Sequence, residues 1–444
     1  MKDSTEVVEG LTAVMREEMS APESLSEMER KLKQALVWLG RLVLGVWLGL
    51  LEGRYVALKI DCRCGGEARF RYRREGKLYT IFGAVRYRRA YYGCEQCHHG
   101  TYPLDERLGL RPNEISAELE RLAGLVGVKM AFGQGSAVFE ELTLVHLSDH
   151  SLDKAAQAYG KEVERQEVQW QNEAQDMDKQ LESKREVCHP PRRLYGSMDG
   201  GRVHLRSEGE PASAWRELKV GAWFEARGRP PVTPDGEWTI RAENVSYYTD
   251  ICDADTFSHL VWATGFQRHA QLAHELVILG DGSRWIWDIV AEHFPSAVQI
   301  VDWFHACQYL APVAQVACHT EEERVAWDEQ VKTDLWEGRL DEVIAACQQQ
   351  VKPRRQDDPA HKAVTYFTNN RQRMNYPVYR ANGYHIGSGT IESAIKQIGA
   401  QRMKIAGARW NLDPARRVAK ARAVFLSGDW NQIAEQRALS LRAA

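Results

Sequence analysis

The sequence predicts a mixed α/β protein, in which a helix-covered mixed sheet follows a small β module and helical N-terminal segments. Three strand-like runs between residues 192 and 252 are followed by alternating strands and helices up to residue 310, which is typical of a mixed sheet packed against helices. Two cysteine pairs bracket short alternating runs between residues 55 and 105. Helical periodicity dominates the remaining segments.

Composition bounds the class of protein. The 444 residues are 44% hydrophobic and 27% charged, which indicates a globular chain of two to four domains and excludes a highly charged disordered one. The net charge of −3 argues against a uniformly basic nucleic-acid binder. The charge is uneven, however: residues 54–89 carry +8 and residues 393–444 carry +7, so the rest carries −18. Local charge therefore favours a nucleic-acid partner.

Residues 1–54 are predicted to be a helical N-terminal segment, with Ser26 and Glu29 as a capping box. The apolar run 35–51 is only 17 residues long and contains Arg41, whereas a membrane-spanning helix needs about 20 apolar residues. We therefore expect a buried or partner-binding helix and no membrane contact. Since no export signal is visible, we expect a cytoplasmic protein, in which paired cysteines favour metal over disulfides.

Residues 55–105 are predicted to be a zinc-ribbon-like module. Short strands are expected at 55–60, 68–72, 78–82 and 85–92, with turns at Gly76 and Gly83. Two thiolate pairs on tight turns can close a tetrahedral structural Zn²⁺ site. The CxC spacing of the first pair is unusual, so His98 is a reserve ligand, and free thiols remain an alternative. The predicted zinc ligands are Cys62, Cys64, Cys94 and Cys97.

Arginines are concentrated between the two cysteine pairs and again near the C-terminus. A basic strand surface beside a zinc site suits contact with a phosphate backbone, although a solvated face is the alternative. Lys396 also lies one helical turn beyond Glu392, where it could meet a phosphate. The predicted DNA contacts are Arg71, Arg73, Arg74, Arg86, Arg88, Arg89, Lys396, Arg402, Lys404 and Arg409.

The rest of the chain divides into four segments. Residues 106–188 are predicted to be helical, as a DNA-binding helix-turn-helix or an ordinary bundle. Residues 189–310 hold the first part of the mixed-sheet core, 311–382 a helical insertion, and 383–444 a last core helix with a basic tail.

Three acids occupy positions that suit metal chemistry. Asp199 lies in a strand, Asp281 ends a buried strand, and Glu392 begins a helix. Carboxylates gathered at one sheet edge suit Mg²⁺, and two such ions can activate water and stabilise a leaving oxygen. Asp302 and His305, in DWFH, are expected to hold a ligand, a water or a neighbouring acid. Each acid alone could instead be a turn or helix-start residue.

The motifs SMDGGRVHLR, LGDGSRWIWD, DWFH and GSGTIESAIKQIGAQRMKIAGARW resemble insertion-sequence DDE transposases, most closely the ISKra type, which is related to the Mutator-like group. The resemblance covers roughly residues 55–430 and includes CRCGG, CEQCHHG and PLDERLGL. It implies an RNase H-like core with an all-helical insertion. It also implies that Asp199, Asp281 and Glu392 are the catalytic acids, with Asp302 and His305 as the C/D-x-x-H motif.

The function expected from these residues is that of a DNA transposase. It would bind mobile-element ends, cleave phosphodiester bonds with two Mg²⁺ ions, and join 3′-hydroxyl ends to target DNA. Acting on two ends implies a homodimer or larger complex, associated with the nucleoid when bound to DNA. The alternatives are an RNase H-like nuclease without strand transfer, a transposase-derived DNA-binding regulator and, more distantly, a zinc-stabilised scaffold.

Overall fold

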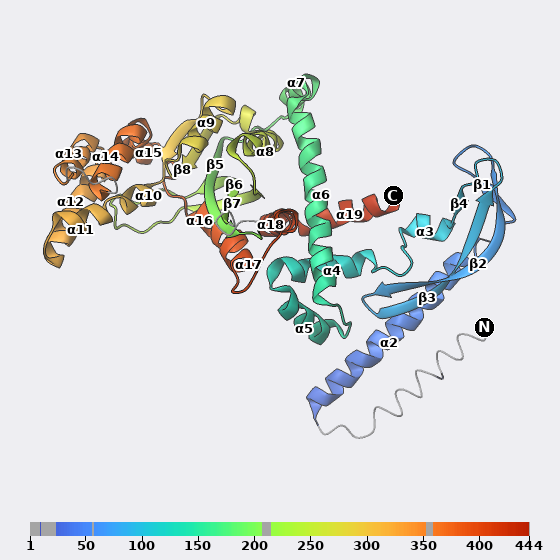
Figure 1. The fold of residues 1–444 in the computed structure, drawn as a ribbon. Helices are drawn as coiled ribbons and strands as arrows, with labels where there is room; N and C mark the ends of the chain where they lie inside the picture. The colour runs from blue at the N-terminus through green and yellow to red at the C-terminus, as the bar shows by residue number, and fades with distance from the viewer. Residues whose placement is uncertain (1–8, 10–23, 56, 207–214, 352–357, 444) are drawn as a thin grey trace. The chain divides into compact units, whose positions relative to one another are not determined.

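The computed structural model describes residues 9, 24–55, 57–206, 215–351 and 358–443, which form two compact units (Figure 1). Unit 1 contains residues 1–162 and 430–444, and unit 2 contains residues 163–429. The prediction of a mixed α/β fold with a mixed sheet and many helices is confirmed.

Unit 1 begins with helix α2 (Leu25–Glu52), which lies along an antiparallel four-stranded sheet, β1 (Lys59–Asp61), β2 (Glu67–Thr80), β3 (Gly83–Cys94) and β4 (Gly100–Thr101). Ser24, rather than the predicted Ser26, caps α2 by accepting a hydrogen bond from the Glu27 N–H. The predicted strands 68–72 and 78–82 are one strand, because Gly76 is not a turn. A Cβ there would lie 2.8 Å from the ring of Tyr87, so the glycine makes room for that ring in the paired strand.

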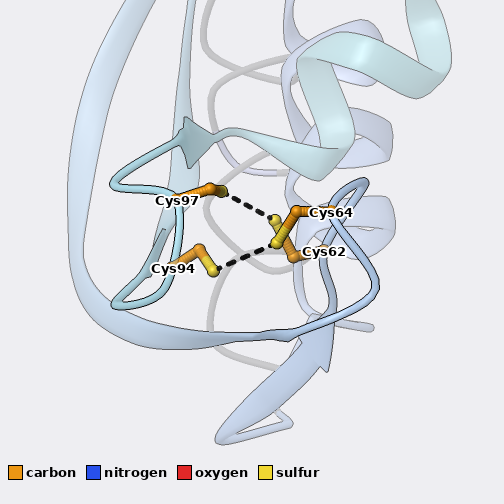
Figure 2. Close-up of side chains that lie close together, drawn as sticks. All are labelled: Cys62, Cys64, Cys94 and Cys97. Carbon is orange, nitrogen blue, oxygen red and sulfur yellow. Dashed lines mark hydrogen bonds between the residues drawn. The ribbon is translucent and has the colours of Figure 1, made fainter.

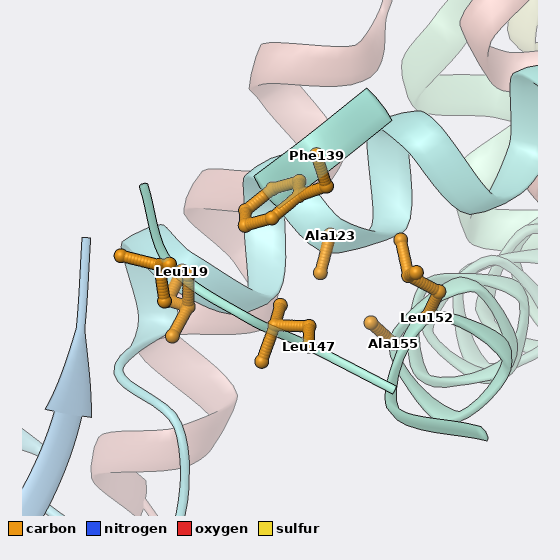
Figure 3. Packing of buried hydrophobic residues seen from close by; sticks show 7 residues of the cluster. Leu119, Ala123, Phe139, Leu147, Leu152 and Ala155 are labelled. Carbon is orange, nitrogen blue, oxygen red and sulfur yellow. The ribbon is translucent and has the colours of Figure 1, made fainter. Parts of the chain in front are cut away.

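The rest of unit 1 is helical. It contains α3 (Pro103–Leu108), α4 (Ala117–Lys129), α5 (Phe132–Thr143), the first half of α6 (Asp149–Gln175) and α19 (Trp430–Ala443). Figure 3 shows its core, in which Leu119 and Ala123 of α4, Phe139 of α5, and Leu147 and Leu152 pack together. Burial of these apolar side chains is the main source of stability for such a bundle.

Unit 2 is built on a five-stranded sheet of order β7-β6-β5-β8-β9. Strands β5 (Arg193–His204), β6 (Trp215–Arg227) and β7 (Arg241–Asp250) are antiparallel, whereas β8 (Glu275–Gly280) and β9 (Val298–Val301) continue from β5 in parallel. This is the order expected from three consecutive strands followed by two strand–helix crossovers.

Unit 2 has helices next to this sheet and a second group of helices between residues 311 and 382. The helices of the first part of unit 2 are α7 (Met177–Glu186), α8 (Ala254–Gln267), η2 (Ala270–Leu272), α9 (Arg284–His293) and α10 (Trp303–Gln308). The segment 311–382 contains α11 (Ala311–Ala317), α12 (Glu321–Trp336), α13 (Leu340–Gln348), α14 (Pro359–Asn370), η3 (Arg371–Arg373) and α15 (Tyr376–Ala381). The chain returns through α16 (Gly389–Ile395), the π-helical turn η4 (Lys396–Ala400), α17 (Gln401–Met403) and α18 (Leu412–Ser427).

Candidate active site and metal centre

Three acids are brought to one level of the unit 2 sheet by strand pairing. Ser197 of β5 pairs with Leu279 of β8, so two residues further on the same register sets Asp199 opposite Asp281. Gly280 pairs with Val301 of β9, which sets Asp281 opposite Asp302, and the Asp302 N–H donates to the Gly280 carbonyl at 2.8 Å. Because β5, β8 and β9 are parallel, the carboxyl ends of β8 and β9 lie level with Asp199, which is in the interior of the longer strand β5.

Asp302 is both a helix cap and the anchor of His305. Its Oδ1 accepts the His305 N–H at 2.6 Å and lies 3.2 Å from His305 Nδ1. The Asp302 side chain is fully buried, and no hydrogen-bond donor among the described residues reaches its Oδ2. A buried carboxylate oxygen without a donor is energetically costly, so this atom suits a cation.

Glu392 reaches the same place from a distant part of the chain. The Trp303 N–H donates to the Ile386 carbonyl at 2.9 Å, which ties the start of α10 to the segment before α16. Glu392 Oε1 then lies 4.0 Å from His305 Nδ1 and accepts from the Ser388 hydroxyl at 3.2 Å. Lys396, one turn further on, lies 3.9 Å from Glu392 Oε2 with its side chain 72% exposed.

The residues closest to metal-ligand geometry are Asp302, His305 and Glu392, whose ligand atoms all lie within 4.8 Å of one another. The sequence assigned the ligand role to Asp199, Asp281 and Glu392, with the Asp302–His305 pair in support. Asp199 and Asp281 are outside this group of three, although both influence the pKa of His305 electrostatically. The five residues therefore share one site, in which the Asp302–His305 pair is more central than the sequence indicated.

Burial and charge shift two pKa values in this site. Burial raises the pKa of Asp199 to about 6, and the negative charges of Asp281 and Glu392 add to the increase, while the Gly200 N–H and His305 oppose it. The hydrogen bond to Asp302 raises the pKa of His305 to about 9 despite its burial, and the charges of Asp199 and Asp281 contribute. At pH 7 His305 is therefore a cation among carboxylates in the metal-free protein.

Two side chains that the sequence did not single out hold the loop at Asp281. Ser283 donates to both Asp281 oxygens, from its N–H to Oδ1 and from its hydroxyl to Oδ2, each at 2.8 Å. The Tyr366 hydroxyl of α14 donates to the Asp281 carbonyl at 2.8 Å. Ser283 could have been found as the turn residue two positions after an aspartate, whereas Tyr366 is 85 residues away and no local signal marks it.

A cleft of about 840 Å³ opens beside this loop, between α9 and the helices of the 311–382 segment. Cationic and aromatic side chains line it, together with polar groups and one carboxylate, that of Asp288, which pairs with Arg284. Those that bear on ligand chemistry are Arg284, Trp287, Tyr309, Lys362, Tyr366 and Arg373. Positive charge in a cleft next to a carboxylate cluster suits a phosphate-containing ligand.

The four predicted zinc ligands lie together in unit 1 (Figure 2). Cys62 and Cys97 have sulfurs 3.6 Å apart, and those of Cys64 and Cys94 are 3.7 Å apart. A disulfide would need about 2.05 Å. Tetrahedral Zn²⁺ with Zn–S bonds of about 2.3 Å places sulfurs about 3.8 Å apart, so the spacing fits a four-thiolate metal site. His98 is not in this group, which favours Cys64, the second cysteine of the unusual CxC pair, as a ligand.

Local backbone geometry forms this cysteine cluster. The Cys62 N–H donates to the Gly66 carbonyl and the Cys94 N–H to the His99 carbonyl, which closes the two turns. Gly65 has φ +83°, a conformation that favours glycine. In the metal-free cluster the N–H groups of Cys97 and Gln96 lower the pKa of Cys94 to about 7. Against the opposing effect of the His99 N–H, hydrogen bonds with Cys64 and Cys62 raise the pKa of Cys97, so of these two thiols only Cys94 favours the thiolate form.

Most of the predicted DNA-contacting arginines of the β2–β3 hairpin are on its surface. Arg86 and Arg88 alternate with the buried Val85 and Tyr87, so one face of β3 packs inward and the other is exposed and cationic. Arg71, Arg73 and Arg74 of β2 are also exposed, although Arg71 pairs with Glu95 and Arg73 with Glu52. Arg89 differs, because it is buried in an ion pair with Asp105.

Fewer cationic side chains of the basic tail are exposed than its sequence suggested. Lys396, Lys404 and Arg409 are exposed, but Arg402 is only 2% exposed and is not available to DNA in this conformation. Further along, most of the cations pair with acids or are buried, although Arg442 is exposed. Lys420 and Arg416 pair with Asp250, Lys420 also pairs with Glu167, Arg417 pairs with Glu164, Arg437 pairs with Glu120, and Arg422 is buried.

A family model matches residues 20–437, which is most of the chain and includes both the cysteine cluster and the acidic site. The chain belongs to the uncharacterised protein family UPF0236. No curated protein matches this member of UPF0236. One similar solved structure is the Drosophila P element transposase strand transfer complex. It has 9% identity and a TM-score of 0.23, over 74% of this chain and 82% of that one.

Proposed function

We propose that this UPF0236 protein is a DNA transposase with an RNase H-like core that uses two Mg²⁺ ions. The observation that carries the proposal is the alignment of Asp199, within β5, with Asp281 and Asp302 at the ends of β8 and β9, while Glu392 lies beside His305. The motif order that resembles ISKra-type DDE transposases supports it, and so does the cationic cleft next to Asp281.

Each residue of the site has a role in this proposal. Asp199, Asp281 and Glu392 would hold the ions, and the buried Asp302 Oδ2, which has no donor among the described residues, fits a further cation contact. The ions, when bound, would activate a water or 3′-hydroxyl nucleophile and stabilise the leaving oxygen. Ser283 and Tyr366 orient Asp281, while Asp302 orients His305. Lys396, exposed and one turn from Glu392, would bind a phosphate.

The experiment is cleavage of DNA that carries the coding region with its flanking sequence, in the presence of Mg²⁺. We expect wild-type protein to cut at the element ends and Asp281→Asn to bind the same DNA without cutting. The control is Asp255→Asn, which makes the same change at an exposed carboxyl group of α8 that does not line the cleft. If Asp281→Asn cuts as fast as the control, Asp281 has no catalytic role.

We also propose that the four cysteines bind a structural Zn²⁺ and that the arginines of the β2–β3 hairpin contact DNA. Since four thiolates leave no open position, this ion would have no direct role in catalysis. The test is DNA binding as a function of salt by Arg86→Ala with Arg88→Ala. Loss of two phosphate contacts should weaken binding and flatten the dependence of log K on log salt by about 2. An unchanged slope would exclude this face as a phosphate contact.

A further inference from the structure

Helix α2 carries a stripe of exposed apolar side chains along its whole length. Successive residues of a helix are rotated by about 100°, and on this basis the side chains of the stripe fall within an arc of about 100° around the helix axis. The helix has 28 residues and is therefore about 42 Å long. The α2 stripe consists of Leu25, Met28, Leu32, Leu36, Val43, Val46, Trp47 and Leu50, each between 42% and 70% exposed.

The opposite side of α2 is already occupied by the sheet of unit 1. A Cβ at Gly40 would lie 2.5 Å from the Phe82 ring, and one at Gly45 would lie 3.7 Å from Val85. Leu48 is buried with Leu78 and Val85. The helix therefore contributes one face to the core of unit 1, as its course along β3 shows (Figure 1). The side chains of the α2 stripe lie outside that core, because each of them is exposed.

By length and composition α2 could span a membrane, with a mean hydropathy of 1.7 over its most apolar window and only 6% of that window buried. Its packing argues against spanning. Arg41, near the helix centre, donates to the Phe82 carbonyl at 3.0 Å, and Glu52 at its end pairs with Arg73 of β2. Inserting α2 would require breaking these contacts and stripping the helix from the sheet.

The α2 stripe is large enough to form an interface. Eight half-exposed side chains of this size present roughly 400–500 Å² of apolar surface, which is near the upper limit for a monomer. Two stripes face to face would bury roughly 800–1,000 Å². The upper end of that range reaches the approximately 1,000 Å² that a specific interface needs.

We propose that the α2 stripe is the contact between two copies of this chain. None of its residues is charged, and α2 as a whole has three acids and four bases, so no oppositely charged partner is favoured. A straight stripe that is apolar along its whole length can pack against a second copy of itself about a two-fold axis, as in the commonest homodimers. This inference does not depend on the transposase proposal.

The test is the mass of the full-length protein at micromolar concentration, measured by light scattering after size exclusion. We expect about 101 kDa, twice the chain mass of 50.6 kDa, for the wild type and about 51 kDa for Leu36→Lys with Val43→Lys. The matched control, Gln34→Lys with Gly49→Lys, adds the same charge to α2 outside the stripe and should remain dimeric. Gln34 is exposed and a Cβ at Gly49 would meet nothing within 4 Å.

Three outcomes would overturn the proposal. The first is a monomeric wild type, or a stripe variant that stays dimeric with an unchanged circular dichroism spectrum. The second is flotation of the wild type, but not of the stripe variant, with phosphatidylcholine–phosphatidylglycerol vesicles, which would assign the stripe to a lipid surface. The third is dimerisation only after removal of residues 1–23, which would mean that this segment covers the stripe in the intact chain.

Discussion

The raised pKa of Asp199 predicts that Asp199→Asn stabilises the metal-free protein. The folded state holds this carboxyl at a pKa of about 6, against 3.8 as its ordinary value. A folded pKa above the unfolded one means that ionisation costs folding free energy. The cost is absent well below pH 3.8, grows through that pH and is complete above pH 6. Two pKa units correspond to about 3 kcal/mol, an upper limit for the gain at pH 8.

The assay is urea unfolding of wild type and Asp199→Asn at pH values from 4 to 8, without added divalent cations. Unfolding is followed by tryptophan fluorescence, to which unit 2 contributes 11 of the 14 tryptophans. The difference should be well under 1 kcal/mol at pH 4 and largest at pH 7–8. Asp255→Asn, at an exposed carboxyl group of α8 outside the cleft, should show no such trend. If Asp199→Asn is less stable than wild type at pH 8, burial and charge repulsion do not act on Asp199 as the geometry indicates.

Three further predictions follow from the site and the cysteine cluster. His305, with a folded pKa of about 9 against 6.5, contributes stability that is present below pH 6.5 and lost as the pH rises through 9. His305→Gln should therefore be less stable than wild type at pH 6 by up to about 3 kcal/mol and equal to it at pH 10, as urea midpoints would show. Tyr366→Phe removes the hydrogen bond to the Asp281 carbonyl, worth about 1 kcal/mol. It should slow DNA cleavage by more than it weakens DNA binding, and equal cleavage rates would exclude a positioning role. Cys94→Ser with Cys97→Ser should abolish the zinc measured by elemental analysis, whereas Cys188→Ser, at an exposed cysteine outside the cluster, should retain it.

The strand pattern around the acidic site could be predicted from sequence because buried parallel strands are short apolar runs that end at loops. ELVILGDG and AVQIVDWF have this form, and the structure places β8 and β9 there. When two such runs pair in parallel, their carboxyl ends lie at the same edge of the sheet, so Asp281 and Asp302 come to lie opposite each other. The central position of Asp302 could not be predicted, because it depends on the hydrogen bond from Trp303 to Ile386, across a separation of 83 residues.

Net charge was a poor predictor of which cations are exposed in the C-terminal tail. Its excess of cations is real, but sequence alone does not reveal that Lys420 lies between Glu167 and Asp250, which are 253 and 170 residues away. Such a buried cation is tolerated only because it is paired. Alternating burial in β3 was easier to predict, since Arg86 and Arg88 fall on the exposed side of a period of two.

Strand transfer is the most direct test of the proposal that this protein is a transposase. The substrate is a pre-cut DNA end with a free 3′-hydroxyl, taken from the boundary of the element, together with a target plasmid and Mg²⁺. We expect wild-type protein to join this end to the plasmid and Glu392→Gln to bind it but form no joined product. Cleavage without any joining, or joining by Glu392→Gln at the wild-type rate, would contradict it.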